Sequence, residues 1–206
     1  MKFSTFKLLV PMVGVSIQAN SASTLIPPYL DDMRIPVAAI GTLISLGPIL
    51  ALTSRLPVGM VYHQKHARTL LSMTMLAMGV TNYLYSLAAN SLLFAVVHAA
   101  NGFAYGAVTT LYMAFFVDSL DADENRNHAI GYYVGSLAMG YSTGNFFGGL
   151  IADYWGYAAT FQLGALLSLV AVGLLWLVHQ GHGGTGASKA KVKEATKLPR
   201  RESAGT

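Results

Sequence analysis

Long apolar runs constrain the fold of this chain more than any other feature of its sequence. A helix needs about 20 predominantly apolar residues to cross the hydrocarbon core of a bilayer. Only 11% of the residues are charged, against roughly 25% in ordinary soluble proteins. Because lipid offers the backbone no hydrogen-bond partner, apolar runs of this length must be helical. We therefore predict an all-α membrane protein with six transmembrane helices, at residues 8–27, 37–61, 69–88, 92–117, 128–151 and 158–179.

The basic residues predict how these helices are oriented, because Lys and Arg collect on the cytoplasmic side of membrane proteins. Of the 13 lysines and arginines, six lie in the tail after residue 180, and Arg34 falls on the opposite side of the membrane. Both termini are therefore expected to be cytoplasmic, with the chain in the cell (inner) membrane. The side that holds the tail also receives Lys2, Lys7, Lys65, Arg68 and Arg126.

Residues 181–206 differ in composition from the transmembrane domain predicted for residues 1–180. Six basic residues stand against Glu194 and Glu202, so the segment carries the same +4 charge as the whole chain. Its polar, glycine-rich composition predicts a disordered cytoplasmic tail that lies near anionic lipid. Because the positive charge sits on this tail rather than on a folded face, a nucleic-acid partner is excluded.

Neither a metal site nor an enzyme is expected. The chain has no cysteine, which excludes disulfides and thiolate ligands. His63 and His66 lie in a loop, where solvated histidines are commoner than metal ligands. Gly140-Tyr-Ser142-Thr-Gly144 fits G-x-S-x-G, but the hydrolase motif needs a strand before the serine. No acid stands at membrane depth to orient a catalytic base, and no cofactor is predicted.

Glycines recur through the fifth run, from residue 131 to residue 149. Spacings of mostly four residues place them on one side of a helix. A glycine face lets a second helix approach closely, which is how many membrane helices pack. The fourth run carries a shorter series of the same kind. The predicted packing glycines are Gly102, Gly106, Gly131, Gly135, Gly140, Gly144, Gly148 and Gly149.

Polar residues inside the apolar runs are the candidates for a solute site, since polar groups are costly against lipid. In the fourth run, spacings of three, four and seven residues place them on one face of a helix. We expect a polar, aromatic cavity that hydrogen-bonds and stacks on a small solute. The candidates are Gln18, Asn20, Ser23, His98, Asn101, Tyr105, Tyr112, Tyr141, Ser142 and Asn145.

Two residues inside the apolar runs, His98 and Arg55, have alternative roles. His98 titrates near neutral pH, so it is the main candidate for proton coupling. Its alternative is a neutral histidine that hydrogen-bonds between helices. Arg55 is interpreted as a structural partner at the cytoplasmic end, with a solute anchor as the alternative.

Several motifs resemble the N-terminal half of a major facilitator superfamily transporter. Gly140-x-x-x-Gly144-Asn145-x-x-Gly148-Gly149 resembles the fifth-helix motif G-x-x-x-G-P-x-x-G-G of proton-coupled exporters, with Asn145 at the proline position. His98-x-x-x-Gly102-x-x-x-Gly106 falls where the family has R-x-x-x-G-x-x-x-G. The turn at residues 153–156, DYWG, and the passage at residues 125–131, NRNHAIG, also resemble the family.

The resemblance implies a bundle that is half of a major-facilitator fold, with a gate on its cytoplasmic side. It implies a secondary active transporter of a small solute, with proton-coupled export as one form. The chain is expected to act alone, to pair with itself or with a separate six-helix half, or to be a fragment of a longer transporter. The alternative is a half-size protein that binds or regulates a partner membrane protein without transport. The implied gate residues are Arg55, Gly59, Lys65, Arg68, Asp118 and Arg126.

Overall fold

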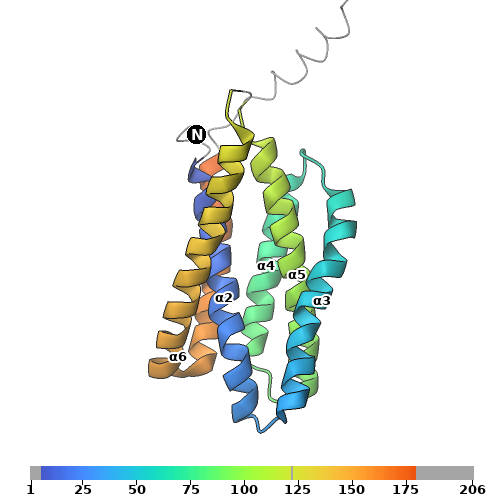
Figure 1. The fold of residues 1–206 in the computed structure, drawn as a ribbon, viewed down its shortest axis with the longest axis vertical. Coiled ribbons are helices and arrows are strands. Elements are labelled where there is room, and N and C mark those ends of the chain that lie inside the picture. Colours follow the sequence, from blue (N-terminus) through green and yellow to red (C-terminus); the bar gives the residue numbers. More distant parts are fainter. Residues whose placement is uncertain (1–5, 122, 180–206) are drawn as a thin grey trace, which may run out of the picture.

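The computed structural model describes residues 6–121 and 123–179, which form an all-helical bundle (Figure 1). Within these residues the chain forms five helices and no strand, which confirms the all-α prediction. Successive helices run in opposite directions along the long axis of the bundle. They are α2 (Leu9–Asp32), α3 (Val37–Val61), α4 (Ala67–Tyr85), α5 (Ser91–Asp118) and α6 (Arg126–His179).

Helix α6 reverses direction at Gly156 (Figure 1). The backbone of Gly156 has φ 82° and ψ 167°, which is not helical and suits a residue without a Cβ. Two antiparallel arms result, residues 126–155 and 157–179, and the predicted fifth and sixth spans fall on them. In the described residues α2, α3, α5 and α6 are long and apolar enough to cross a membrane. Six separate crossings and cytoplasmic termini stay predictions.

Two helices extend further than their apolar runs. Helix α2 continues through Pro27 and Pro28 to Asp32, although the run was predicted to end at residue 27. A proline removes one N–H but leaves the rest of the helical hydrogen bonds intact, so a helix held in a bundle tolerates it. The first arm of α6 likewise continues past residue 151 to Trp155 beside the kink.

The helices associate in two groups. α2 packs mainly against α6, α3 packs mainly against α5, and α4 contacts both α5 and α6. α2 and α3 have little contact beyond the turn that joins them. The bundle is therefore tied together by α4, while a space is left between α2 and α3.

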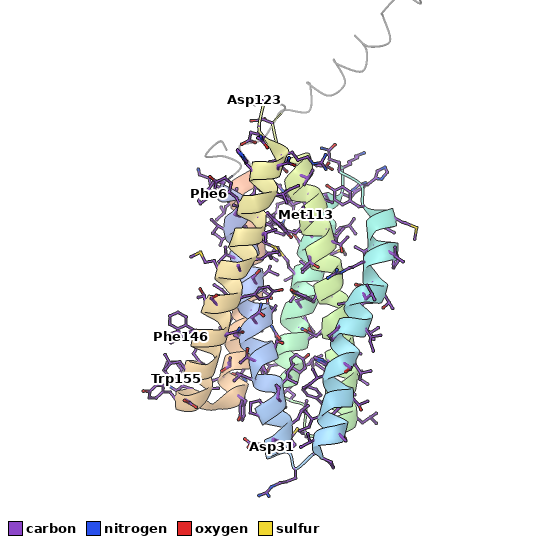
Figure 2. The ribbon with its side chains drawn as sticks, in the orientation of Figure 1. Phe6, Asp31, Met113, Asp123, Phe146 and Trp155 are labelled. Carbon is purple, nitrogen blue, oxygen red and sulfur yellow. The ribbon has the colours of Figure 1, made fainter. Side chains whose placement is uncertain are left out.

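Apolar side chains fill the two ends of the bundle and also cover its outside. One core cluster includes Met12, Met75 and Phe116, and the other includes Leu30, Phe94 and Phe161. Outside, Phe146 and Trp155 project away from the bundle with 66% and 71% of their surface exposed (Figure 2). Exposed apolar surface on this scale is unusual for a soluble protein and suits contact with lipid.

Candidate functional site

A cavity of about 450 Å³ lies at mid-height in the bundle, between α2, α3 and α5. Asn20, Pro48 and Tyr105 are near the middles of their helices, so the cavity would be at the centre of a bilayer crossed by them. Such a volume is within the usual range for sites that hold a small molecule. The lining residues are Ala19, Asn20, Ala22, Ser23, Ile26, Gly47, Pro48, Ala51, Leu52, Arg55, Tyr85, His98, Asn101, Gly102, Tyr105 and Tyr141.

Six of the ten candidate residues for the solute site lie on the wall of this cavity, namely Asn20, Ser23, His98, Asn101, Tyr105 and Tyr141. The other four, Gln18, Tyr112, Ser142 and Asn145, do not line it. Gln18 is 1% exposed, and its Oε1 accepts a 2.5 Å hydrogen bond from Ser168 in α6. Asn145 Oδ1 accepts a 2.6 Å hydrogen bond from Thr24 in α2. These two residues connect α2 to α6 instead.

Both ring nitrogens of His98 have partners. Nε2 lies 3.1 Å from the carbonyl oxygen of Ile44 in α3, and Nδ1 lies 2.6 Å from the hydroxyl of Tyr85 in α4. A carbonyl can only accept, so Nε2 carries the hydrogen, and Nδ1 of the neutral ring accepts from Tyr85. The imidazole also stacks on Phe94, with centroids 5.5 Å apart. His98 therefore joins three helices at the cavity wall.

The Ile44 carbonyl is available to His98 because of a proline. In an α-helix this carbonyl would accept from the N–H four residues later, at position 48. Pro48 has no N–H, and it lies inside α3 on the cavity wall. Gly47 allows the approach, since a Cβ there would come within 2.6 Å of His98 Nε2. Gly47 and Pro48 together explain how His98 reaches the α3 backbone.

Hydrogen bonds hold the other polar side chains of the wall in place. The hydroxyls of Tyr105 and Tyr141 are 2.6 Å apart, which joins α5 to α6. Asn101 Nδ2 donates to Thr81 Oγ1 in α4 at 2.8 Å. Asn20 Nδ2 donates to the carbonyl of Ser16 one turn earlier, also at 2.8 Å. Each bond leaves further donor or acceptor capacity that a solute can use.

Arg55 also lines the cavity, six residues before the end of α3. Its side chain is exposed, and no hydrogen bond or ion pair links it to another described residue. Its place on the cavity wall is compatible with either role, so a structural partner of the cytoplasmic end and a group that meets the solute both stay predictions for Arg55.

Most of the predicted packing glycines lie where two helices touch. A Cβ on Gly144 would be 2.5 Å from the carbonyl oxygen of Ile17 in α2, and one on Gly148 would be 2.7 Å from Ser21 Cα. Gly140 meets Ser16 of α2 in the same way. In α5, Gly102 meets the backbone of Gly47, and Gly106 meets that of Ala51.

Three glycines at the two ends of the series do not contact another helix in the described residues. A Cβ on Gly131, Gly135 or Gly149 would meet no atom within 4 Å. The groove predicted along residues 131–149 is therefore limited to residues 140–148, where α2 crosses α6. Gly149 does not belong to the packing set, because it follows Gly148 directly and so points to another side of the helix.

The residues implied for a cytoplasmic gate lie at one end of the bundle, apart from Arg55. Gly59 is in the last turn of α3, and Lys65 and Arg126 are exposed. The Arg68 guanidinium lies over the Trp176 ring, 4.8 Å from its centroid. A gating role for the group stays a prediction.

Asp118 at this end has a partner that the sequence did not suggest. Tyr62 follows the last residue of α3, and its hydroxyl donates to Asp118 Oδ2 at the end of α5 at 2.9 Å. Burial raises the pKa of Tyr62 above its ordinary value, and the hydrogen bond and negative charge of Asp118 raise it further. This bond ties α3 to α5 next to the implied gate residues.

Apart from Arg55, sequence reasoning missed the α3 and α4 parts of the cavity, chiefly Gly47, Pro48 and Tyr85. Gly47-x-x-x-Ala51 is a small-xxx-small pattern, so the close contact with α5 had a signal in the sequence. Tyr85 had none, because a tyrosine near a helix end suits a membrane interface equally well.

Comparison with known families agrees with this arrangement. The family described as Major Facilitator Superfamily matches residues 9–204, which is most of the chain. A comparison with curated proteins found no match. The match confirms the resemblance to this family, which consists of transporters rather than enzymes. With its membrane-length helices and mid-depth cavity, the chain belongs to the major facilitator superfamily of integral membrane transporters.

Proposed function

We propose that this chain is one half of a secondary active transporter, and that the cavity between α2, α3 and α5 is its share of the solute pathway. The observation that carries the proposal is the mid-depth position of a cavity walled by Asn20, His98, Asn101 and Tyr105. Polar groups at this depth are costly unless they face a pathway or one another. Transporters of this kind hold solute near the midplane, where two repeats meet.

The second half is proposed to be another copy of the chain or a separate six-helix protein. Support comes from the little contact between α2 and α3 and from the exposure of Leu52 and Arg55 beside the cavity. Leu52 keeps 67% of its surface exposed on the cavity side of α3. A second half placed there would close the cavity and allow it to open to one side of the membrane at a time.

Proton coupling through His98 is part of the proposal. A protonated ring would have to donate from Nδ1, and Tyr85 can adapt because its hydroxyl either donates or accepts. Proton uptake would therefore reverse one hydrogen bond without moving a helix. The alternative, a neutral histidine that only connects helices, predicts the same packing but no dependence of transport on the pH gradient.

Reconstitution tests the proposed function. The purified full chain is placed in proteoliposomes, alone and with any co-purifying membrane protein, and uptake of labelled small solutes is measured with and without a pH gradient. Flux that Asn101→Leu abolishes supports the proposal, since Asn101 lines the cavity. Failure of every solute in both preparations contradicts it. Stable co-purification of a partner without flux would instead favour the non-transporting regulator.

A further inference from the structure

Arg55 is the one residue with a full charge among the described residues that line the cavity. The other polar members are neutral amides, hydroxyls and phenols, and His98 has the hydrogen bonds of a neutral ring. A guanidinium stays ionised under any physiological condition. The cavity therefore has a net positive charge at its wall.

Among the described residues, no acidic side chain lies at the depth of Arg55. The acidic residues of the described chain lie at helix ends and in loops, namely Asp31, Asp32, Asp118, Asp121, Asp123, Glu124 and Asp153. An unpaired charge within a membrane span is costly, and the cost falls when an opposite charge binds next to it. A solute that brings a negative charge would supply the counter-charge that the described residues lack.

We infer that the solute of this cavity is a small organic anion, with its carboxylate or similar acidic group held by Arg55. The inference rests on the proposed function and specifies its substrate class. The guanidinium fork matches the two oxygens of a carboxylate and can hold them through two parallel hydrogen bonds. The remaining wall, formed by amides and aromatic rings, accommodates the rest of the solute.

The surroundings of Arg55 also favour an anion. Tyr105 lines the same cavity as Arg55, and its hydroxyl bonds to that of Tyr141. A pair of bonded hydroxyls uses one of its two hydrogens, so the other can be donated to a bound anion. A cationic solute would meet the guanidinium without any carboxylate on the wall, which makes its binding unfavourable.

Charge-selective thiol labelling tests the field of Arg55 without a known solute, because the natural chain has no cysteine. Leu52→Cys places a thiol on the cavity wall one turn from Arg55. Its labelling rates are measured with methanethiosulfonates that carry either a sulfonate or a trimethylammonium group. Adding Arg55→Gln should lower the sulfonate-to-ammonium rate ratio roughly tenfold, as expected for removal of a nearby unit charge.

The matched control is Ala89→Cys in the exposed α4–α5 loop, where Arg55→Gln should leave the ratio unchanged. An unchanged ratio at Leu52→Cys would overturn the inference. So would an equal change at both positions, because the effect would then not be a property of the cavity.

Binding of three phenyl compounds of similar size but different charge tests the substrate class. Benzoate, benzamide and benzylammonium are added to the purified full chain, and the melting temperature is followed, since a ligand stabilises the state it binds. Benzoate should raise the melting temperature most, Arg55→Gln should remove that shift, and Arg55→Lys should keep part of it. No shift with benzoate, or an equal shift with either other probe, contradicts the inference.

The two proposals fail in different ways. Flux of a solute without any preference for anions would preserve the transporter and refute the anion inference. Selective stabilisation by benzoate without flux of any solute would support the anion site and contradict transport by the chain.

Discussion

The Nε2 of His98 donates a 3.1 Å hydrogen bond to the carbonyl oxygen of Ile44, across the interface between α5 and α3. Pro48 leaves this carbonyl without its helical partner. A proline that weakens one helix therefore supplies the acceptor for a side chain of another. This hydrogen bond holds His98 on the cavity wall, and it accounts for the positions of Ile44, Pro48 and His98 together.

Replacing His98 by alanine should destabilise the bundle. His98→Ala removes the bonds to Ile44 and Tyr85 and leaves the buried Tyr85 hydroxyl without its partner. The expected loss is about 1–3 kcal/mol, measured by reversible unfolding in mixed detergent. His128→Ala is the matched control, because His128 is exposed at the start of α6. Equal stability of the two variants would show that the His98 bonds contribute nothing.

The contribution of Pro48 can be separated with a double-mutant cycle. Pro48→Ala restores an N–H that competes with His98 for the Ile44 carbonyl, so its effect should depend on whether His98 is present. A coupling energy of about 0.5–2 kcal/mol is expected between Pro48→Ala and His98→Ala. The control cycle uses Pro57→Ala, one further proline of α3. Additive behaviour of both cycles would contradict the linkage.

Proton coupling gives a prediction about transport rather than stability. If His98 carries the proton, His98→Gln should keep solute exchange but lose its dependence on an imposed pH gradient, because glutamine hydrogen-bonds without titrating near neutral pH. Proteoliposome flux with and without the gradient measures this. A gradient dependence that survives in His98→Gln would assign His98 to the interhelical role alone.

The contact between α2 and α6 should be sensitive to a single methyl group. A Cβ on Gly144 would be 2.5 Å from the Ile17 carbonyl, whereas one on Gly135 would meet nothing within 4 Å. Gly144→Ala should lower stability by about 1–3 kcal/mol through overpacking, and Gly135→Ala should have no such cost. Melting temperature and yield of monodisperse protein are the readouts. If both variants have the same stability, the close packing of α2 against α6 at Gly144 is contradicted.

The bond between Tyr62 and Asp118, at the same end of the bundle as Arg68, should make the stability of the protein depend on pH. The pKa of Tyr62 is raised in the folded state, while an unfolded tyrosine titrates near 10. The contribution of this bond to stability is therefore fully present below pH ~10 and decreases as the pH rises further, because tyrosine first ionises in the unfolded state only. Tyr62→Phe should lower the melting temperature at pH 7 and lessen its further fall above pH 10. Tyr132→Phe, on an exposed phenol, is the control.

Much of the fold could be predicted, because the constraint is local. Run length and apolarity alone predicted α3 at residues 37–61, and the observed helix is Val37–Val61. The break between the two arms of α6 falls in the predicted DYWG turn. This feature is also local, since Gly156, the glycine of the turn, adopts φ 82° without strain. The ends of α2 at Asp32 and of the first arm of α6 at Trp155 were missed, since a helix can outlast its apolar run.

The cavity was only partly predictable. Asn101, Tyr105 and His98 share one face of α5 by helical spacing, and they line the cavity together. Gln18 is also polar and also lies well inside an apolar run, yet it bonds to Ser168 rather than lining the cavity. Which side of α2 meets α6 depends on Gly140 and Gly144 fitting against Ser16 and Ile17, and periodicity within one helix does not contain that information.

The sequence by itself determined that the chain is a helical membrane protein and which face of each helix carries polar or small residues. Lipid permits few backbone structures, so length and composition suffice for those properties. Only the tertiary structure decided which faces meet, that Arg55 lines a cavity, and that His98 bonds to the carbonyl freed by Pro48. These properties depend on contacts between residues far apart in the chain, where a single methyl group decides whether two helices can approach.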